Sequence, residues 1–306
     1  YLKAKSLTDY AKSCYQCGIC SSACPKARVV KGFLPRRIVY NVISGNSDLV
    51  VNSGDAWVCL TCRECEVKCP MNIDFVDMVR ELRSTMVKKG LNCVVAHDNT
   101  FGSSLLNILK SRDIKPQRKQ FLASDVKIDD KSEVLYFMGC VTYMDIVFKA
   151  DVGFEGMEIA NNTIRLLNRI GIQPAVLDGE KCCGHDQLWR GDKGTFKEFG
   201  AQNIEYLRKY KTILTTCPEC YYTLAVEYKK KMGIELNVKH ISEFLMDYKD
   251  KLRGKGDGTI TYHDSCRLGR YMGVYDAPRE LLKILGYKLI EMEKIKEDSL
   301  CCGVPQ

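Results

Sequence analysis

The sequence predicts a multi-domain α+β protein, in which an α-helical N-terminal domain precedes a duplicated α/β unit. Three observations lead to this class. The chain has 306 residues, a length typical of about two domains. Eight of the 17 cysteines lie within the first 70 residues, where apolar residues recur at helical spacing. From residue 134 onward, short apolar runs alternate with amphipathic segments, which is typical of an α/β layer with a largely parallel sheet.

The composition is that of an ordinary soluble globular protein. Apolar residues make up 45% and charged residues 27%, which excludes a disordered chain, a collagen-like chain and a coiled coil. No run of 18 apolar residues is present to predict a transmembrane helix. With 46 basic and 38 acidic residues the formal charge is +8. The simplest interpretation is a lysine-rich solvated surface. A basic face for an acidic partner or a membrane is the alternative. Nucleic acid is not expected, because no basic run is interleaved with aromatic residues.

The cysteines indicate metal rather than disulfides. Their number is odd, so complete internal pairing is impossible. A chain of this length can bury a core without covalent cross-links. Fifteen of the cysteines fall into tight patterns, and only Cys93 and Cys140 stand apart. Regular spacing of this kind indicates metal ligands in a reducing compartment.

The N-terminal domain is expected over residues 1–100 and is predicted to be helical. The spacing of apolar residues predicts a helix over 35–43 and a second one from 73 to a stop near Gly90. No strand is expected here. Residues 101–133 are rich in Lys, Asp and Ser, which predicts a linker across a surface with one short helix at 105–109.

From residue 134 the pattern predicts two copies of one unit. The expected strands of the first copy are 134–138, 175–177, 212–215 and 236–238, with helices near 157–171, 194–210 and 219–232. A similar strand at 259–262 precedes Cys266, and Cys-Cys-Gly at 182–184 reappears at 301–303. Both offsets are about 120 residues, so we expect a first repeat at 134–258 and the start of a second at 259–306.

Two blocks near the N-terminus share the spacing C-x2-C-x2-C-x3-C-P. This is the bacterial run for [4Fe–4S] clusters, whose fourth cysteine ligates the other cluster in two-cluster proteins. The expected ligands are Cys14, Cys17, Cys20 and Cys69 for one cubane cluster, and Cys59, Cys62, Cys65 and Cys24 for the other. Zinc is disfavoured, because zinc sites normally use paired C-x2-C units. The domain is therefore predicted to be ferredoxin-like. Its helical spacer resembles the α-helical ferredoxin domain of the iron–sulfur subunits of succinate dehydrogenase and fumarate reductase.

Five more cysteines are expected to converge from three loops, namely Cys140, Cys182, Cys183, Cys217 and Cys220. Cys140 and Cys217 follow predicted strands, so both lie at the carboxyl edge of the sheet, where open α/β sheets place their sites. Pro218 suits the first position of a helix, which puts Cys220 in a first turn that favours thiolate. The adjacent cysteines cannot easily bond to each other, so both are expected to face a metal. Gly184 is expected to let the backbone come close to it.

Taken together, the chain resembles the CCG-domain iron–sulfur oxidoreductases, and best of all the catalytic subunit of heterodisulfide reductase. In the membrane-bound form of that enzyme, a ferredoxin-like domain and two CCG repeats are fused in this order. The matching motifs are SCYQCGICSSACP at 13–25, WVCLTCRECEVKCP at 57–70, KCCG at 181–184, TTCPEC at 215–220, YHDSCRLGR at 262–270 and LCCG at 300–303. They are specific to the superfamily rather than to one substrate.

The resemblance implies that a complete five-cysteine motif holds a noncubane [4Fe–4S] cluster that cleaves a disulfide. The set from Cys140 to Cys220 matches one such motif. The second set departs from it, because Cys266, Cys301 and Cys302 are present without a following C-x2-C. The spacing of the first repeat places two more cysteines near positions 336 and 339, at roughly the same step of the repeat. We therefore expect a longer natural chain and one or two noncubane clusters. The alternative is a degenerate second site.

Two histidines are candidate proton donors, because reduction of a disulfide to two thiols needs two protons. His185 follows the first Cys-Cys-Gly, and His263 precedes Cys266. The alternative for both is a packed or capping role. His97 and His240 are expected to be structural.

The leading hypothesis is a catalytic subunit that passes single electrons through two cubane clusters to the CCG domain and there reduces a disulfide, such as that of coenzymes M and B. One alternative is an electron-transfer subunit between a flavoprotein dehydrogenase and quinone or a cytochrome, as in glycerol-3-phosphate dehydrogenase and glycolate oxidase. Another is a subunit of thiol:fumarate reductase or of a sulfite-reduction complex. No G-x-G-x-x-G is present in the sequence, so we expect a separate electron-donor subunit of flavoprotein or cytochrome b type. The expected location is the cytoplasm, or the inner membrane face through a partner.

Overall fold

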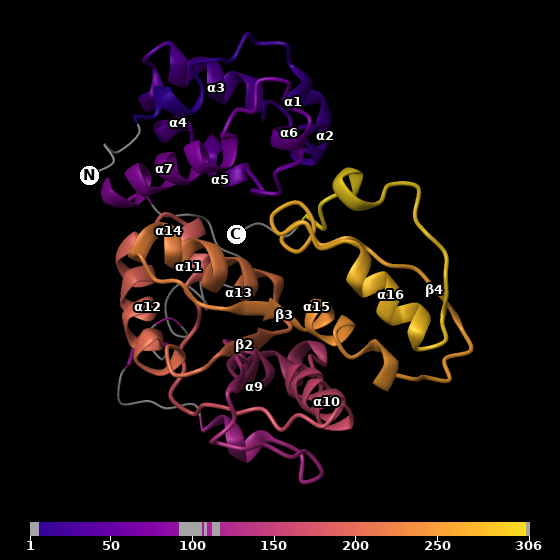
Figure 1. Ribbon diagram of the computed structural model, residues 1–306. Helices are drawn as coiled ribbons and strands as arrows, with labels where there is room; N and C mark the ends of the chain where they lie inside the picture. Colours follow the sequence, from indigo (N-terminus) through magenta and orange to yellow (C-terminus); the bar gives the residue numbers. More distant parts are fainter. Residues whose placement is uncertain (1–5, 92–105, 107–108, 112–116, 304–306) are drawn as a thin grey trace.

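The computed structural model describes residues 6–91, 106, 109–111 and 117–303. Figure 1 shows three regions, which are an indigo helical region, a central layer of helices and strands, and a yellow C-terminal unit. The order confirms a helical ferredoxin-like region followed by an α/β region with small parallel sheets. Cys93, His97 and most of the segment 101–116 lie outside the described residues.

The N-terminal region is helical, as the apolar spacing predicts. Its elements are η1 (Thr8–Tyr10), α1 (Ile19–Ala23), α2 (Pro25–Val29), α3 (Pro35–Ile43), α4 (Ser47–Ser53), α5 (Asp55–Val58), α6 (Glu64–Val67) and α7 (Phe75–Lys88). The helix expected over 35–43 is α3, which buries Ile38, Val39 and Val42 in one core with the apolar face of α7. No strand occurs among the described residues 6–91.

The central region is a three-stranded parallel sheet between helices. Its elements are β1 (Val134–Tyr136), α9 (Val141–Val152), α10 (Gly156–Arg169), α11 (His185–Trp189), α12 (Lys193–Leu207), β2 (Thr212–Thr215), α13 (Pro218–Tyr222), a π-helical turn η4 (Thr223–Glu227), α14 (Tyr228–Met232), β3 (Val238–His240), α15 (Ile241–Met246) and η5 (Lys249–Lys251). The strand order is β1-β2-β3, with Leu135 opposite Ile213 and Leu214 opposite Lys239.

Both faces of this sheet are buried, because successive strand residues enter different cores. Leu135 and Ile213 pack with residues of α12, α13 and α14, whereas Tyr136 packs with α10. Figure 1 shows the same division, with α9 and α10 on one side of the strands and α12 and α14 on the other. The two-sided burial explains why these strands are apolar runs rather than alternating ones.

β1 and β4 (Thr259–Ile260) each end two residues earlier than expected, and two other expected strands differ more from the structure. The strand at 175–177 is reduced to one bridge, in which Ala175 pairs with Leu135, because the chain then turns away toward the Cys-Cys-Gly loop. The strand expected at 236–238 begins at Val238 instead. Gly233 ends α14 in a left-handed conformation, and the chain needs the following residues to return to the sheet.

The C-terminal unit repeats the first one in a shorter form. It contains β4 (Thr259–Ile260), α16 (Asp276–Ile284), β5 (Lys288–Leu289) and η6 (Lys296–Asp298). β4 and β5 pair in parallel, as β1 does with Ala175 in the first unit. In both units a helical segment connects the paired strands, and Cys-Cys-Gly follows the second of them.

The segment that is predicted to be a linker differs from the prediction at one point. From residue 117 the described chain forms a short 3-10 turn, η3 (Arg118–Phe121), rather than only crossing a surface. The side chain of Arg118 is fully buried. It enters the central region, where it contacts the loops that carry cysteines.

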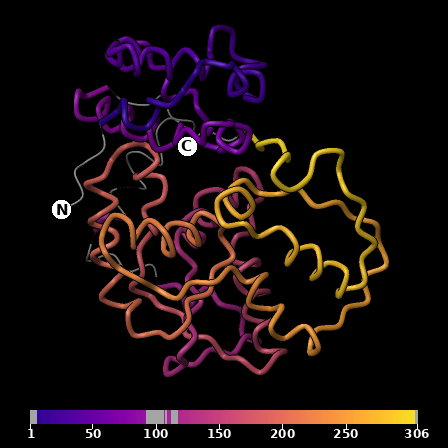
Figure 2. Tube along the Cα trace, turned by 45° about the horizontal axis from the view of Figure 1, so that its top comes forward, coloured from indigo at the N-terminus to yellow at the C-terminus, as the bar shows by residue number. Residues whose placement is uncertain are grey.

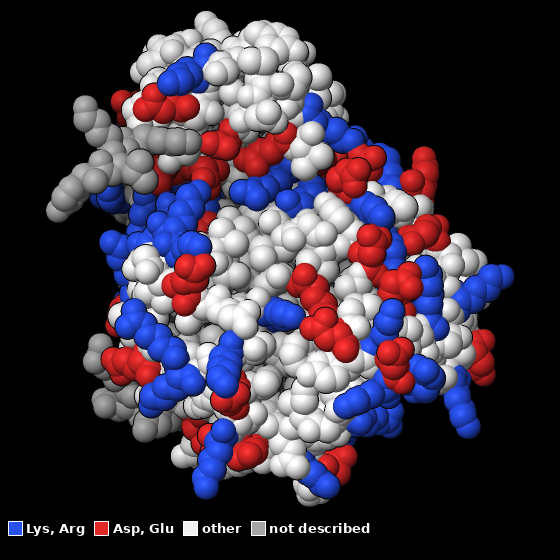
Figure 3. Space-filling view, in the orientation of Figure 1, with Lys and Arg blue, Asp and Glu red and all other residues white. Residues whose placement is uncertain are grey.

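The helical region docks on the other two through charged groups. α7 packs against α11, and α6 packs against η6. Ion pairs join Asp77 to Lys230 at 2.7 Å and Glu81 to Lys193 at 2.6 Å. In Figure 3, side chains of both signs gather along this boundary, while the far end of the helical region is mostly uncharged on the face shown. Figure 2 shows the helical region at the same end of the molecule after a 45° turn.

One ion pair in this interface is buried. Arg80 on α7 contacts Glu227 at 2.8 Å, and their side chains are 4% and 0% exposed.

Across the described part of the chain, no helix is both long enough and apolar enough to span a bilayer.

We expect Glu227→Ala to lower the free energy of unfolding by about 3 kcal/mol, because it leaves the charge of Arg80 buried with Asp77 as its remaining acidic partner. The matched control is Glu235→Ala, which breaks an exposed pair with Lys229 and should cost about 0.5 kcal/mol or less. Anaerobic urea denaturation of the iron-loaded protein measures both. Equal effects of the two substitutions would contradict the role given to the buried pair.

Candidate metal centres

The two ferredoxin-like loops have the same backbone conformation. Gln16 and Gly18 have positive φ angles of 64° and 87°. Thr61 and Arg63, at the same motif positions of the second block, have 51° and 63°. Left-handed residues other than glycine persist only where the surroundings impose them. Both loops are therefore held in the same unusual backbone conformation. Binding of one metal cluster by three closely spaced sulfurs would impose this conformation on each loop.

Backbone N–H groups point at the first sulfur of each loop. The N–H of Gln16 donates to Cys14 Sγ at 3.4 Å, and that of Thr61 donates to Cys59 Sγ at 3.3 Å. Sulfur accepts such bonds best as a thiolate or as a metal ligand. The left-handed residues thus also serve to direct donors toward sulfur.

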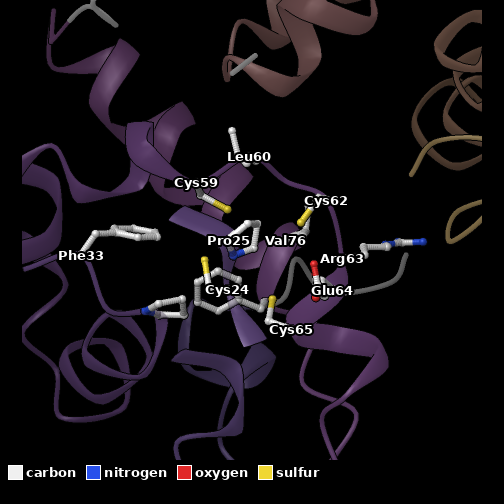
Figure 4. Close-up of a pocket in the computed structure, with 12 residues that line it drawn as sticks. Cys24, Pro25, Phe33, Cys59, Leu60, Cys62, Arg63, Glu64, Cys65 and Val76 are labelled. Carbon is white, nitrogen blue, oxygen red and sulfur yellow. The ribbon is translucent and has the colours of Figure 1, made fainter. Parts of the chain in front are cut away.

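Each loop borders a hollow that also receives a cysteine from the other block. One hollow, of about 390 Å³, is lined by Cys14, Cys17, Cys20 and Cys69, with Cys65 at its side. The other, of about 330 Å³, is lined by Cys59, Cys62, Cys65 and Cys24. Figure 4 shows these last four sulfurs around one space. We call the first the outer hollow, since Cys17 is exposed, and the second the inner hollow, since Cys59 and Cys62 are buried.

The inner hollow fits a metal cluster better than free thiols. Burial raises the pKa of Cys59 to about 12 and that of Cys65 well above its usual range. A cationic metal would replace these protons. Thiolates are the ligands that iron–sulfur clusters take. The acidic group in the lining is Glu64, and burial raises its pKa also.

The structure brings all five cysteines of the first CCG set together at the carboxyl edge of the sheet. Cys183 Sγ lies 3.5 Å from Cys220 Sγ, and the thiol of Cys182 interacts with that of Cys140. Cys217 caps α13, and its sulfur accepts the N–H of Cys220 at 3.5 Å. Pro218 occupies the first position of α13, as expected, and Cys220 lies in the first turn.

Two glycines are required here by backbone geometry. Gly139, just before Cys140, has φ 62°, and a Cβ there would lie 3.1 Å from Cys220 Sγ. Gly184 has φ 83°, and its Cβ would lie 3.0 Å from the ring of Phe196. The reason for Gly184 therefore differs from the expected close approach to metal. It is a left-handed turn packed against α12.

Sequence reasoning missed a buried pair that holds two cysteine loops together. The guanidinium of Arg118 donates to the carbonyl of Glu180 at 2.9 Å and to that of Gly139. The carboxylate of Glu180 accepts the N–H groups of Met138 and Gly139, both at 2.8 Å. Both charged side chains are 0% exposed. They tie the loop before Cys140 to the loop before Cys-Cys-Gly. No local motif signals the pair, because Arg118 lies in the expected linker.

Two further side chains fix the backbone of the Cys-Cys-Gly loop. Asn203 on α12 accepts the N–H of Lys181 at 2.7 Å and donates to the carbonyl of Cys182 at 3.0 Å. The hydroxyl of Tyr228 on α14 donates to the carbonyl of Cys183 at 3.2 Å. All of these groups are buried, so the loop is held by hydrogen bonds that water does not weaken.

One buried hydroxyl at this site has no partner. The hydroxyl of Tyr143, on α9, makes no hydrogen bond among the described residues. Its ring lies against Arg118, and burial raises its pKa, with smaller contributions from Cys182 and Glu180. A buried donor without an acceptor is costly. The sulfide of a bound cluster is an acceptor that would satisfy it.

The expected proton donor His185 is buried at the N-terminus of α11. Its Nε2 accepts the indole N–H of Trp189, because an indole can only donate. The ring proton therefore lies on Nδ1, which is 3.1 Å from Asp186 and 3.6 Å from Glu219. These two carboxylates face the same ring nitrogen. A proton-donor role for His185 stays a prediction.

The other expected donor, His263, is exposed and lies in the second CCG unit. Its Nε2 donates to the carbonyl of Leu300 at 2.8 Å, beside the second Cys-Cys-Gly. This hydrogen bond joins His263 to the loop that carries the second Cys-Cys-Gly. His240 is buried, bonds Ser242 and the carbonyl of Thr216, and has its pKa lowered to about 4 by burial. The structural role expected for His240 follows from these contacts.

Two cysteines of the second CCG set, Cys266 and Cys301, lie beside the inner hollow. The thiol of Cys301 interacts with those of Cys266 and Cys62, and Cys302 is exposed. The pKa of Cys62 is lowered to about 7, first by the thiol of Cys301 and also by the charge of Arg270, while burial opposes the shift. Whether this set holds a cluster stays a prediction.

Comparison with known proteins identifies the class. Residues 10–74 match the 4Fe-4S dicluster domain, and residues 134–225 and 260–306 match the cysteine-rich domain CCG. The chain therefore belongs to the family of iron–sulfur oxidoreductases that join a 4Fe-4S dicluster domain to cysteine-rich CCG domains.

Individual relatives extend the comparison. A subunit of dihydromethanophenazine:CoB–CoM heterodisulfide reductase from Methanosarcina mazei is 32% identical over 95% of this chain and 77% of the relative. A subunit of fumarate reductase (CoM/CoB) from Methanothermobacter marburgensis is 29% identical over 97% of this chain and 59% of the relative. EtfAB:quinone oxidoreductase from Syntrophomonas wolfei is 32% identical over 83% of this chain and 37% of the relative.

We expect Cys69→Ser to damage the cluster of the outer hollow and to spare that of the inner one, although Cys69 follows the second loop in sequence. The readout is cluster-resolved EPR after reduction. Cys302→Ser is the matched control and should leave both signals intact, since Cys302 lines neither hollow. Loss of the inner signal alone would show that the cross-ligation is wrong.

We expect Arg118→Met to remove about four irons, those of the first CCG set, while the ferredoxin-like clusters stay. The substitution keeps an unbranched apolar stem but leaves Glu180 and the carbonyl of Gly139 without their buried partner. Lys119→Met is the matched control, because Lys119 pairs with the exposed Asp130. Iron analysis after gel filtration measures both. Full iron content in Arg118→Met would show that the first CCG set does not need Arg118 to hold its metal.

Proposed function

We propose that this chain relays electrons through two cubane clusters to a noncubane cluster at the first CCG set, where a disulfide is reduced. The observation that carries the proposal is the complete set of five sulfurs at one edge of a parallel sheet, with three of them buried. One relative, whose alignment covers 95% of this chain and 77% of its own length, is a subunit of a heterodisulfide reductase.

The placement of the three sulfur sets supports an ordered relay. The outer hollow reaches the surface at the exposed Cys17, which suits exchange with a separate donor. The inner hollow lies on the side that faces the CCG units, and Figure 4 shows brown ribbon of the C-terminal part of the chain beyond Arg63. A cluster of aromatic residues, with Trp189 and Tyr222 buried, packs on Val76, which lines the inner hollow. Trp189 stacks on Tyr222 at 6.0 Å and meets Tyr271 at 5.8 Å.

The proposed reaction takes two electrons and two protons and converts one disulfide into two thiols. When bound, the noncubane cluster supplies the electrons and a thiophilic iron site. This chain's own residues hold the loops that place the sulfurs, through Arg118, Glu180 and Asn203. The half-buried Cys140 and Cys217 border the side from which a substrate could approach.

Proton supply is assigned to the group around His185. Its Nδ1–H points to Asp186 and Glu219, and the side chains of these two acids are 43% and 33% exposed. A proton from solvent can therefore reach the buried ring through either carboxyl group. His263, in the second unit, would serve a substrate that extends toward Cys301.

A second candidate function is electron transfer without substrate chemistry, between a flavoprotein and quinone. The observation that favours it is the similarity to EtfAB:quinone oxidoreductase. In that case the first CCG set would hold its cluster but bind no thiol. The two functions therefore differ in whether the first CCG set binds a thiol, which can be measured.

We expect the anaerobically reconstituted chain to hold about 12 irons and, when oxidised, to give a new paramagnetic signal on addition of coenzyme M. Cys183→Ser is expected to lose the signal, with about eight irons kept. The control is Cys302→Ser, with the signal intact. Full iron loading without a thiol-dependent signal would favour the electron-transfer function. One zinc with about eight irons would contradict the noncubane cluster altogether.

A further inference from the structure

The two ferredoxin-like loops share one backbone shape but differ in the charges around them. Each of three carbonyl groups in the inner loop accepts a hydrogen bond from an arginine. Arg83 donates to the carbonyl of Cys59 at 2.6 Å, Arg267 to that of Thr61 at 2.9 Å, and Arg270 to that of Cys62 at 2.7 Å.

These arginines are shielded from water. Arg83 is 0% and Arg267 is 2% exposed, and Arg270 is half-buried between the inner loop and Ser299. Arg83 spans the interface, since it also donates to the carbonyl of Trp189 at 3.0 Å. Arg267 and Arg270 belong to the second CCG unit. Most of the cationic contact with the inner loop thus comes from outside the ferredoxin-like region.

The outer loop has a different environment. Its neighbouring cation is Arg36, whose guanidinium is 3.7 Å from the position that a Cβ of Gly18 would take. Arg36 is exposed, so water and salt screen its charge. Among the described residues, no arginine side chain is seen to donate to a carbonyl of the outer loop from Cys14 to Cys20.

Acidic groups do not cancel the additional positive charge around the inner loop. Glu66 is paired with Arg63 at 3.0 Å. Glu64 is the one acidic residue in the lining of the inner hollow, and Arg63 stands in the same lining. A cluster with four thiolates gains one negative charge when it is reduced. A buried cation therefore stabilises the reduced form, and net charge and hydrogen bonding are among the factors that set the potential of such clusters.

We propose that Arg83, Arg267 and Arg270 raise the reduction potential of the inner cluster above that of the outer cluster. Electrons that enter at the outer cluster then collect at the inner one, beside the CCG units. Arg267 and Arg270 act through the backbone of the inner loop, so they are positioning residues. Because both belong to the second CCG unit, the reduction potential of the inner cluster depends on docking of that unit. This inference rests on the proposed function for the presence of both clusters.

The test is an EPR-monitored redox titration of the full chain, with Cys69→Ser used to assign the inner signal. In the unsubstituted chain the inner cluster should be reduced first. Arg270→Gln should shift the inner midpoint to lower potential, whereas Arg270→Lys, which keeps the charge, should restore most of it. Arg36→Gln is the matched control and should leave the inner midpoint in place.

Two results would overturn the inference. One is reduction of the outer cluster first in the unsubstituted chain, which decides the matter even if every arginine variant fails to load iron. The other is an unchanged inner midpoint in Arg270→Gln with full iron content. Both differ from failure of the proposed function, which would appear as missing cubane clusters or a missing thiol-dependent signal in the unsubstituted chain.

Discussion

The carbonyl groups of the inner loop are the point at which the parts of this molecule are joined. Three arginines and the hydroxyl of Tyr271 bind the carbonyls of Cys59, Thr61 and Cys62. Carbonyl oxygens in a tight cysteine loop cannot all find partners within the loop, and buried ones must find them elsewhere. The second CCG unit supplies Arg267, Arg270 and Tyr271, and α7 supplies Arg83. The same contacts therefore satisfy the backbone, dock the domains and bring cations to a proposed electron carrier.

The interface adds an aromatic layer to this polar one. Arg80 lies 3.8 Å and Arg267 lies 4.4 Å from the centroid of the Trp189 ring. A guanidinium stacked on an indole keeps its donors free in the ring plane, so one side chain can both cover an aromatic face and bind a carbonyl. This explains how several arginines can be buried at one interface. Each of the two has a carbonyl or carboxylate partner as well as a ring.

Much of the fold could be predicted from local patterns. The helix at 35–43 and the apolar strands at 134 and 212 follow from periodicity, and Pro218 marks the start of a helix. The cysteine motifs name the sulfurs that converge. What could not be predicted are the groups that hold them. Arg118 looks like one more basic residue in a polar linker, and Asn203 like one more polar residue of an amphipathic helix. Their roles depend on burial and on partners far away in sequence, which periodicity does not encode.

The two kinds of site also differ in how they are prepared for metal. In the ferredoxin-like region, each hollow takes a cysteine from both blocks, and left-handed residues such as Gln16 and Thr61 hold the loops in a conformation of some strain. Metal binding and folding are coupled in such an arrangement, because the metal cross-links segments that are distant in sequence. The first CCG set is different. Arg118, Glu180 and Asn203 fix its loops by hydrogen bonds that need no metal. A relay cluster can rely on its own bonds for its place, since it only passes electrons. A site that must leave room for a substrate needs loops that the protein itself holds in position.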